Sequence, residues 1–372
     1  MTDRTPSEPE TIEFLEIEEV EEPLNIGNRP FKGAAGTIPA SKAKRFLKAV
    51  SMGIATLLLT VVLLCIFLYG VMAVLVYGPS STAKKQFIMS VQETSAIGFL
   101  ANLFCSQEEI DRIKAENTVK DSNDITDTGL IVIDNDNNSN PDVPDIQIVD
   151  VKGATYRGKL MIVKDPSRVF VGTIDGFVQG NGKVVSQIAA RYNAIGGVNG
   201  GEFVDGSTTW TGMPVGLVMV DGKLINGSEN TVYHVTGITY DNKLVIGNMN
   251  YAQAKEKNIR DCVSINKSIG PFLIINNEAQ NVSGIGGGIN PRTAIGQRAD
   301  GSILLLAVDG RQANSLGASF SDLQDIMFQH GAVNASAMDG GTSTQMYYDG
   351  NIINVPYSPT GPRSCPTAWL VK

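Results

Sequence analysis

The feature that most constrains this chain is a long stretch without charge near its N-terminus. No Asp, Glu, Lys or Arg occurs between Ala49 and Ala83, and residues 49–77 are almost wholly apolar. At about 1.5 Å per residue, a helix of this length crosses a hydrocarbon core of about 30 Å with tilt to spare. A soluble core helix would show a polar face, and a cleaved signal peptide would have a shorter apolar run. The sequence therefore predicts a transmembrane helix over residues 49–78.

The flanks of this stretch predict its orientation. Basic residues cluster on its N-terminal side, and only Lys84 and Lys85 follow it closely. The basic residues before it are Arg29, Lys32, Lys42, Lys44, Arg45 and Lys48. Because basic flanks stay in the cytoplasm, we expect a single-pass protein of the cell membrane with its N-terminus inside and its C-terminal domain extracellular. Residues 1–28 hold nine acids and one base, so residues 1–48 are predicted to be a disordered acidic tail with a basic flank.

Two segments connect the predicted membrane helix to the rest of the chain. Apolar residues recur at helical spacing between Lys84 and Asn117, which predicts a helical stalk over residues 79–120 that either pairs with a second copy or caps the domain. Residues 121–145 are rich in Asp, Asn and Ser and are predicted to be an acidic linker. Within it, Asp134 to Asp145 resembles a calcium-binding loop, but Ser139 replaces the turn glycine, so a solvated loop is favoured.

From residue 146 onward the sequence is typical of a β-rich domain. Short β-branched runs are separated by turn dipeptides that tolerate positive φ, namely Asp221-Gly222, Asp241-Asn242, Asp300-Gly301 and Asp349-Gly350. Helices are predicted at 185–193, 250–257 and 321–330, the last with Ser321 and Gln324 as a capping box. We therefore expect an α+β fold, a mainly antiparallel sheet with a few packed helices, over residues 146–372, preceded by the transmembrane helix and the stalk.

Composition excludes several classes of function. The net charge is −8 and no Lys/Arg cluster lies outside the membrane flank, which argues against a nucleic-acid partner. Four cysteines, one of them in the apolar run, are too few for a disulfide framework; unpaired thiols are favoured, and a Cys262–Cys365 bridge stays open. The two histidines, His234 and His330, have no metal-ligand spacing, and His330 fits a helix C-terminus better than a catalytic role.

Polar residues gather around glycines where predicted strands end. They occur in four segments, Asn199 to Glu202, Asn290 to Thr293, Asp309 to Arg311 and Asp339 to Ser343. Each alone is compatible with an ordinary turn, since Gly, Asn and Asp dominate turns for conformational reasons. Loops on a rigid sheet are, however, where binding residues concentrate, and glycines let a ligand approach the backbone.

The order of these motifs carries a family resemblance. NGGEF, GPFLI, NPRTAIG, LLLAVDGR, SDLQDIMFQHGAV, AMDGGTST and GPRSCPTAWLV follow one another, and together they resemble the successive motifs of the phosphodiester glycosidase family over residues 146–372. The resemblance implies that Asp339 is a catalytic carboxylate, with Asp309 near it in the site. Glu202, which stands where the family usually has an aromatic residue, and Asp309 are further candidates for the catalytic role. The substrate-binding residues that the resemblance implies are Asn199, Gly200, Gly201, Arg292, Thr293, Gly340, Gly341, Ser343 and Arg363.

The implied function is a membrane-anchored extracytoplasmic hydrolase. It would cleave the glycosidic bond of a sugar-1-phosphodiester in a cell-envelope glycopolymer or exopolysaccharide, with Arg292 and Arg363 neutralising the phosphate. Glu202 and Thr342 depart from the family pattern, which leaves open a non-catalytic module that binds phosphate-containing wall or capsule polysaccharide, and a glycosyl transferase acting on it. No cofactor is expected, although carboxylates of this kind can also hold a divalent cation.

Overall fold

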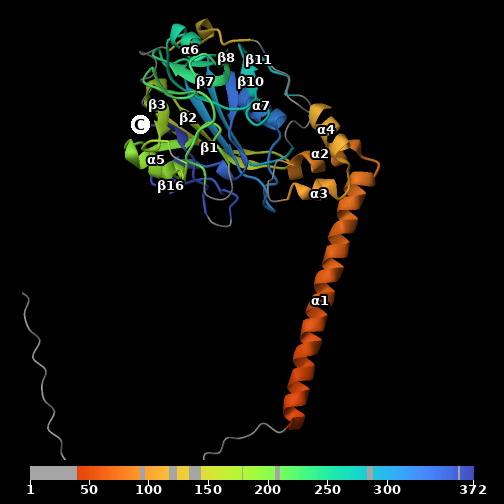
Figure 1. Cartoon of the computed structure of the whole chain (residues 1–372). Helices are drawn as coiled ribbons and strands as arrows, with labels where there is room; N and C mark the ends of the chain where they lie inside the picture. Colours follow the sequence, from red (N-terminus) through yellow and green to blue (C-terminus); the bar gives the residue numbers. More distant parts are fainter. Residues whose placement is uncertain are drawn as a thin grey trace, which may run out of the picture. The chain divides into compact units, whose positions relative to one another are not determined.

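The computed structural model in Figure 1 describes residues 40–92, 97–116, 124–133, 144–177, 179–205, 210–282, 288–358 and 361–372. The chain divides into two compact units, residues 1–66 and 67–372. The structural predictions for residues 1–39 and for the acidic stretch 134–143 fall outside the described residues.

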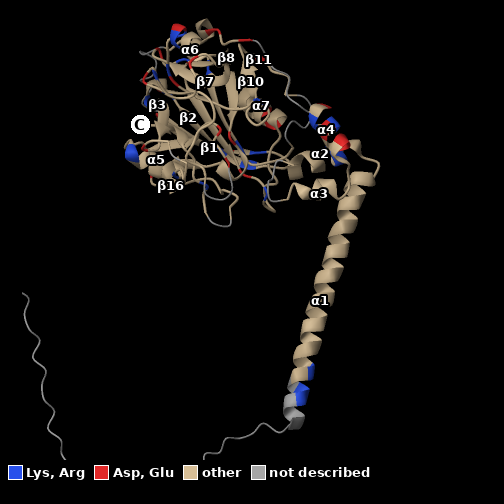
Figure 2. Ribbon diagram, in the orientation of Figure 1, with Lys and Arg blue, Asp and Glu red and all other residues tan. Residues whose placement is uncertain are grey.

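One helix carries the apolar stretch. Helix α1 (Ala40–Tyr77) contains a segment of 31 residues, Leu47–Tyr77, that is long and apolar enough to cross a membrane. Figure 2 shows basic residues at the start of this helix and no charged residue along the rest of it. Its Leu, Val and Ala side chains are almost all exposed.

The chain from residue 144 onward is built on three antiparallel sheets. Their strand orders are β1-β2-β13-β12-β14-β10-β11, β16-β15-β4-β17-β3 and β6-β5-β9-β7-β8. The strands are β1 (Ile146–Lys152), β2 (Arg157–Val163), β3 (Val169–Thr173), β4 (Gly196–Asn199), β5 (Val218–Val220), β6 (Lys223–Asn226), β7 (Tyr233–Thr239), β8 (Leu244–Met249), β9 (Ile259–Ser264), β10 (Phe272–Ile275), β11 (Glu278–Ala279), β12 (Arg292–Arg298), β13 (Ile303–Val308), β14 (Ala332–Met338), β15 (Met346–Tyr348), β16 (Asn351–Ile352) and β17 (Thr367–Val371).

A central core lies between the inner faces of the three sheets. Side chains from each sheet meet there, among them Leu305 of β13, Trp369 of β17 and Ile238 of β7, all fully buried. The outer face of the seven-stranded sheet packs on Phe320 and Leu323 of a helix, so the middle strands β12, β13 and β14 are buried on both faces. This double burial explains the continuous apolar sequence of β13, whereas β12 and β14 also carry buried polar side chains such as Gln297 and Asn334.

Six helices surround the sheets or precede them in the described part of the chain. Helices α2 (Ser81–Gln92), α3 (Phe99–Asn102) and α4 (Gln107–Glu116) lie within the range predicted as a stalk. Helices α5 (Val185–Arg191), α6 (Tyr251–Glu256) and α7 (Phe320–Gln329) lie where helices are predicted, and each packs on an outer sheet face. The α+β fold with mainly antiparallel sheets is thus confirmed.

The capping prediction for the last helix is wrong by two residues. Ser319, not Ser321, is the N-cap of α7: its hydroxyl accepts from the backbone N–H of Asp322, and the Asp322 carboxylate accepts from the N–H of Ser319. The helix starts earlier because its first residue, Phe320, is fully buried against the sheet. Tertiary packing therefore selects one of two possible capping serines.

All four turn dipeptides join antiparallel strands. They connect β5 to β6, β7 to β8, β12 to β13 and β15 to β16. Asp221 has φ 49° and Gly222 φ 70°, and Asp349 and Gly350 have 46° and 83°, which is the left-handed backbone of a tight hairpin turn. The four cysteines are free, so the Cys262–Cys365 bridge does not form.

Part of the predicted linker is packed on the sheets rather than tethering them. In residues 124–133, Thr126 exchanges hydrogen bonds with Ile246 of β8, and the N–H of Val132 donates to the carbonyl of Ala299 at 2.8 Å. Ile131 is fully buried. Residues 124–133 contain five apolar residues and two acids, so this segment packs on the domain, a feature that the average composition of residues 121–145 hides.

Candidate active site

Strand directions bring the predicted site residues to one edge of the seven-stranded sheet. Strand β12 runs antiparallel to β13 and β14, and its register pairs Arg292 with the last residue of β13 and Thr293 with the last residue of β14. Asp309 directly follows β13 and Asp339 directly follows β14. The start of one strand and the ends of its two neighbours therefore place these four residues side by side.

Asn199 joins this edge to the second sheet. It is the last residue of β4, is almost fully buried, and pairs with the start of β17. Its amide nitrogen donates to the carbonyl oxygen of Asp339 at 2.7 Å, and its amide oxygen accepts from Thr293 Oγ1 at 2.8 Å and from the N–H of Gln345 at 3.2 Å. One buried side chain thus fixes the position of the Asp339 peptide relative to three strands.

Glycines permit the close approach of these chain segments. The N–H of Asp339 donates to the carbonyl of Gly200 at 3.4 Å. A Cβ at Gly200 would lie 2.5 Å from Thr367 Oγ1, and one at Gly340 would lie 2.8 Å from the carbonyl oxygen of Pro291. Because backbone atoms cannot move aside as a flexible side chain can, no larger residue fits at Gly340 without shifting the loop that follows Asp339.

Asp339 is partly exposed as a residue, but its carboxyl group is enclosed and has a perturbed pKa. This pKa is raised from 3.8 to about 6, mainly by burial and also by the nearby negative charge of Glu202. A hydrogen bond from the Ser343 hydroxyl, the charge of Arg363 and the N–H of Gly340 act in the opposite direction. The group is therefore largely ionised at neutral pH yet basic enough to take up a proton, as a catalytic carboxylate must be.

Arg363 is the partly exposed cation of this cluster. Its guanidinium donates to Thr342 Oγ1 at 3.1 Å, pairs with the carboxylate of Asp205, and lies 5.3 Å from the centre of the Phe203 ring. Thr342 thus supplies a hydrogen-bond acceptor for the arginine. Phe203 is the last residue of the NGGEF motif, whereas Asp205 lies in no motif, and only its closeness in sequence to Glu202 signals a connection with the site.

Arg292 is held differently, inside the protein. It is 4% exposed, its Nε donates to the carbonyl of Ala318 at 3.2 Å and its Nη2 to that of Gly288 at 3.1 Å. The guanidinium lies 4.0 Å from the centre of the Phe320 ring. This charge braces the loops around the start of β12 and adds positive potential to the edge where Asp339 lies.

The two other candidate carboxylates have distinct surroundings. Glu202 follows the glycine pair after β4; burial raises its pKa, opposed by a hydrogen bond of 2.8 Å from the N–H of Asn266. Asp309 accepts from Asn354 Nδ2 at 3.0 Å and from the N–H of Val355 at 2.9 Å, while burial raises its pKa. Glu202 acts electrostatically on Asp339, whereas Asp309 faces the segment after β16.

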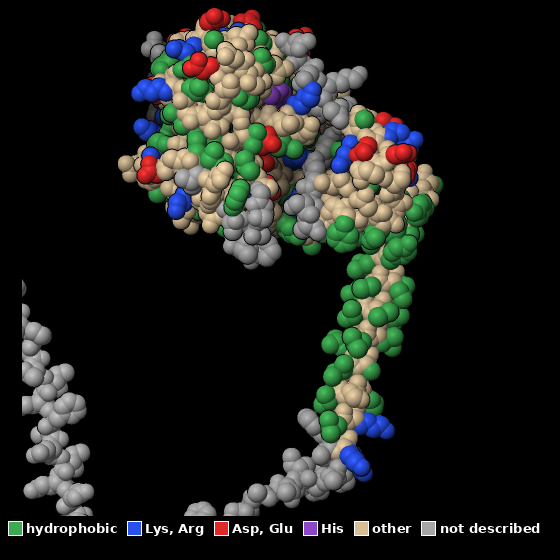
Figure 3. All heavy atoms as spheres, viewed as in Figure 1, with side chains coloured by type: hydrophobic (Ala, Val, Ile, Leu, Met, Phe, Trp, Pro, Cys, Tyr) green, Lys and Arg blue, Asp and Glu red, His purple; other side chains and the backbone are tan. Residues whose placement is uncertain are grey.

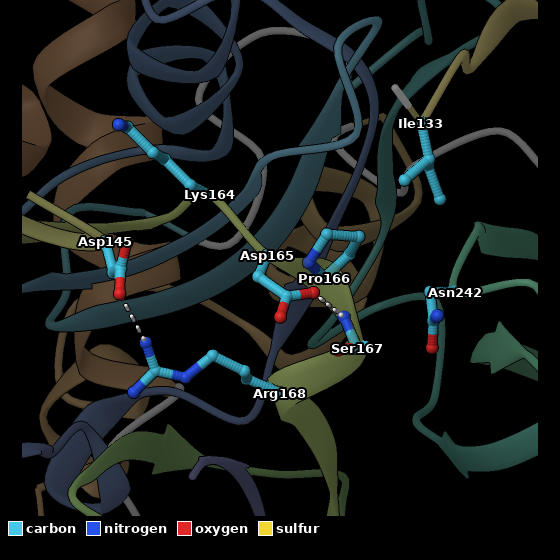
Figure 4. Close-up of a pocket in the computed structure, with 8 residues that line it drawn as sticks. All are labelled: Ile133, Asp145, Lys164, Asp165, Pro166, Ser167, Arg168 and Asn242. Atoms are coloured by element: carbon cyan, nitrogen blue, oxygen red, sulfur yellow. Dashed lines mark hydrogen bonds and ion pairs between the residues drawn. The ribbon is translucent and has the colours of Figure 1, made fainter. Parts of the chain in front are cut away.

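A hollow at a different place in the fold involves none of the predicted site residues. The cavity of about 320 Å³ in Figure 4 is lined by residues of the β2–β3 connection together with Ile133, Asp145 and Asn242. Arg168 points toward Asp145, with an ion pair of 3.8 Å, and Lys164 points away from this pair. Charges of both signs line this hollow, so its chemistry does not single out a ligand.

The described residues do not form a ready-made metal site. Within the described ranges, no group of three or more His, Cys, Asp or Glu side chains is placed to hold a metal ion. Most of the calcium-loop match, residues 134–143, lies outside those ranges. The carboxylates around Asp339 are instead balanced by Arg363 and by hydrogen-bond donors.

Comparisons with known proteins point to one family. The family model for phosphodiester glycosidases matches residues 192–372. The chain is 26% identical over 228 residues to N-acetylglucosamine-1-phosphodiester alpha-N-acetylglucosaminidase of Mus musculus, covering 55% of this chain and 42% of that protein. It is 42% identical over 65 residues to the SPbeta prophage-derived uncharacterized protein YomE of Bacillus subtilis, covering 18% of this chain and 10% of that one. The chain thus spans less than half the length of both curated relatives.

A solved structure shares the fold. The catalytic domain of zebrafish N-acetylglucosamine-1-phosphodiester alpha-N-acetylglucosaminidase superposes with a TM-score of 0.51 at 23% sequence identity, covering 62% of this chain and 84% of that domain. The family match includes Asp339, Glu202 and Arg363, the three charged residues that the structure gathers at the edge of the sheets. Residues 192–372 of this chain therefore match the phosphodiester glycosidase family.

Proposed function

We propose that this chain is a membrane-anchored hydrolase that cleaves the bond between a sugar C1 and a phosphodiester oxygen. The single observation that carries the proposal is the buried carboxylate of Asp339, with its pKa near 6, beside the cation of Arg363 in a domain of this family. A carboxylate next to a fixed positive charge suits a substrate that combines a reactive sugar carbon with an anionic leaving group.

The proposed reaction needs little acid catalysis from the protein. Breaking the C1–O bond leaves the electron pair on a phosphate monoester, whose second pKa is about 6, so the departing oxygen needs little protonation. Asp339 would take a proton from the water that attacks C1, or attack C1 itself before water releases the sugar. Either route requires the ionised form of Asp339, which predominates above pH 6 or so.

The neighbours of Asp339 have separate proposed roles. Arg363, with about a quarter of its side chain exposed, would neutralise the phosphate as charge develops on it. Glu202 is the second carboxylate of the cluster, placed to accept a hydrogen bond from a sugar hydroxyl or to share the base role. Asn199, whose amide is used by Asp339, Thr293 and Gln345, would position the catalytic carboxylate rather than contact the substrate.

The proposed membrane helix α1 determines in which compartment the domain meets its substrate. With basic residues in the first turns of α1 and an apolar segment of 31 residues within it, the proposed topology is a single span with the N-terminus inside the cell and the domain outside. The substrate would then be a sugar-1-phosphodiester in an envelope glycopolymer or exopolysaccharide. Protease added to intact cells should remove the domain and leave a small membrane-bound fragment; protection of the domain would reverse the topology.

The decisive experiment measures release of free sugar. The full chain in detergent is incubated with UDP-N-acetylglucosamine and, separately, with phosphodiester-containing wall-polymer fragments. The wild type should release sugar, and Asp339→Asn should not. The matched control is Asp241→Asn, which makes the same chemical change at an exposed turn residue and should retain wild-type turnover.

Three outcomes would contradict the proposal. Near-normal turnover by Asp339→Asn would remove this residue from catalysis. Retention of the polymer without release of any sugar, by wild type and variant alike, would indicate a binding module. Product that forms only when an acceptor sugar is added would indicate a glycosyl transferase.

A further inference from the structure

A small apolar surface lies on the helices that follow the apolar segment of α1. Phe99 is 61% exposed and Leu103 56%, and Ile97 is exposed beside them. The charged side chains of the same helices pair elsewhere, Lys84 with Glu109 at 2.7 Å and Lys85 with Glu116 at 2.8 Å. We refer to Ile97, Phe99 and Leu103 as the α3 surface.

Figure 3 shows this separation of side-chain types on the α2–α4 cluster. Hydrophobic side chains gather on the side of the cluster that continues into the last turns of α1, and charged ones gather on the opposite side. Exposed aromatic and aliphatic groups of a soluble segment would ordinarily be scattered among polar ones. A contiguous apolar surface continuous with a lipid-facing helix indicates a binding surface instead.

Specific contacts fix the α3 surface to the last turns of α1. The hydroxyl of Tyr77 donates to the carbonyl of Phe104 at 2.8 Å, and the Phe104 ring lies 4.9 Å from that of Tyr69. Met72 and Val76 on the same turns pack into the apolar core of the α2–α4 cluster. The segment Tyr69–Tyr77 therefore belongs to the helical cluster on one side.

The length of α1 indicates where these contacts lie relative to the hydrocarbon core of the bilayer. Its apolar segment of 31 residues is about 46 Å long, well beyond the hydrocarbon core of about 30 Å. Counted from the last basic residue, Lys48, about 20 residues cross that core and end near Tyr69. Tyr69 then lies at the outer boundary, where aromatic residues are favoured, and the following turns lie among the headgroups.

We propose that the α3 surface is a second membrane contact, with Phe99 and Leu103 inserted into the outer headgroup region of the bilayer that α1 crosses. Phe104 packs against Tyr69, so α3 lies at the level of the headgroups. There the apolar side chains leave water while the charged side of the cluster remains in it. The inference rests on the proposed transmembrane span and adds to it a fixed placement of the helices that lead into the domain.

The test uses tryptophan quenching in the full chain. Wild type and single variants are reconstituted into phosphatidylcholine vesicles with or without lipids brominated near the headgroup end of the acyl chain. Phe99→Trp and Leu103→Trp should be quenched well above the background of the two native tryptophans. Val232→Trp, at a residue of similar exposure in the sheet domain, should not be. Leu63→Trp, within α1, reports on the span itself.

The outcomes test the membrane contact of the α3 surface separately from the transmembrane span of α1. Quenching of Leu63→Trp without quenching of Phe99→Trp beyond the Val232→Trp control overturns the membrane contact and leaves the span intact. If Leu63→Trp is not quenched by any bromolipid depth, the span is wrong and this inference fails with it. If Phe99→Trp is shielded from both bromolipid and aqueous iodide, the surface pairs with a second copy of the chain, and the bilayer contact is overturned.

Discussion

Replacing Asp339 by Asn is expected to stabilise the fold at neutral pH while it removes activity. The carboxyl group is buried, and burial raises its pKa from 3.8 to about 6. Above that range the folded protein must hold a charge that water would solvate better, so the ionised group destabilises the fold. Asparagine keeps the shape and an acceptor oxygen for the Ser343 hydroxyl but carries no charge.

The sign and size follow from the two pKa values. Below pH 3.8 the group is protonated in the folded and unfolded chain alike and costs nothing. As the pH rises, the unfolded chain releases its proton first, and stability is lost until the folded group ionises near pH 6. A shift of this size corresponds to about 3 kcal/mol, and about 2.5 kcal/mol of it develops between pH 4 and pH 8.

Denaturant unfolding of the detergent-solubilised chain, followed from pH 4 to pH 8, measures this difference. The free energy of unfolding of Asp339→Asn minus that of the wild type should grow by about 2.5 kcal/mol over this range. The same difference for the exposed control Asp241→Asn should stay flat. A difference for Asp339→Asn that does not change with pH would refute the reasoning, because it would mean that this carboxyl group is not desolvated.

Other predictions test the same site. Sugar release should fall about tenfold for each pH unit below about 6, because the ionised fraction of Asp339 falls in that proportion; a rate independent of pH down to 4 would contradict this. Asp309→Ala should lower stability by about 1–2 kcal/mol, measured by thermal unfolding, because the amide of Asn354 and the N–H of Val355 lose their half-buried acceptor; Asp309→Asn should lose less, and equal losses would be unexpected. Gly340→Ala should abolish sugar release, since its Cβ would lie 2.8 Å from the carbonyl of Pro291; full activity would show that the loop can shift freely.

Local features of the fold could be predicted because their cause is local. The four hairpin turns depend on residues that tolerate positive φ, and α5, α6 and α7 on short apolar periodicities. The cap of α7 could not be placed, since Ser319 and Ser321 are equally suited locally and only the burial of Phe320 distinguishes them. The order of strands in the three sheets likewise depends on contacts distant in sequence.

The candidate site likewise combines residues that the sequence predicts with features that arise only when the chain folds. Asp339, Arg292 and Asn199 lie in glycine-bounded motifs, and the family resemblance of those motifs is enough to suggest a role for each. Asp205, which pairs with Arg363 across a separation of 158 residues, lies in no motif, and its contribution arises only when the chain folds. The raised pKa of Asp339 is also a tertiary property, because burial and not sequence neighbours causes most of it.

The pairing of β2 and β3 with strands near the C-terminus determines which segment of the chain can be transferred between proteins as a folding unit. The family match begins at residue 192, yet β2 is hydrogen-bonded along β13, and β3 along β17. A chain cut at residue 192 would leave a long row of unpaired backbone groups on β13, an edge prone to aggregation. Because residues 124–133 also hydrogen-bond to the sheets, the smallest segment that keeps all strand partners together begins no later than there. A recombination point at residue 192 would separate β2 from β13 and β3 from β17.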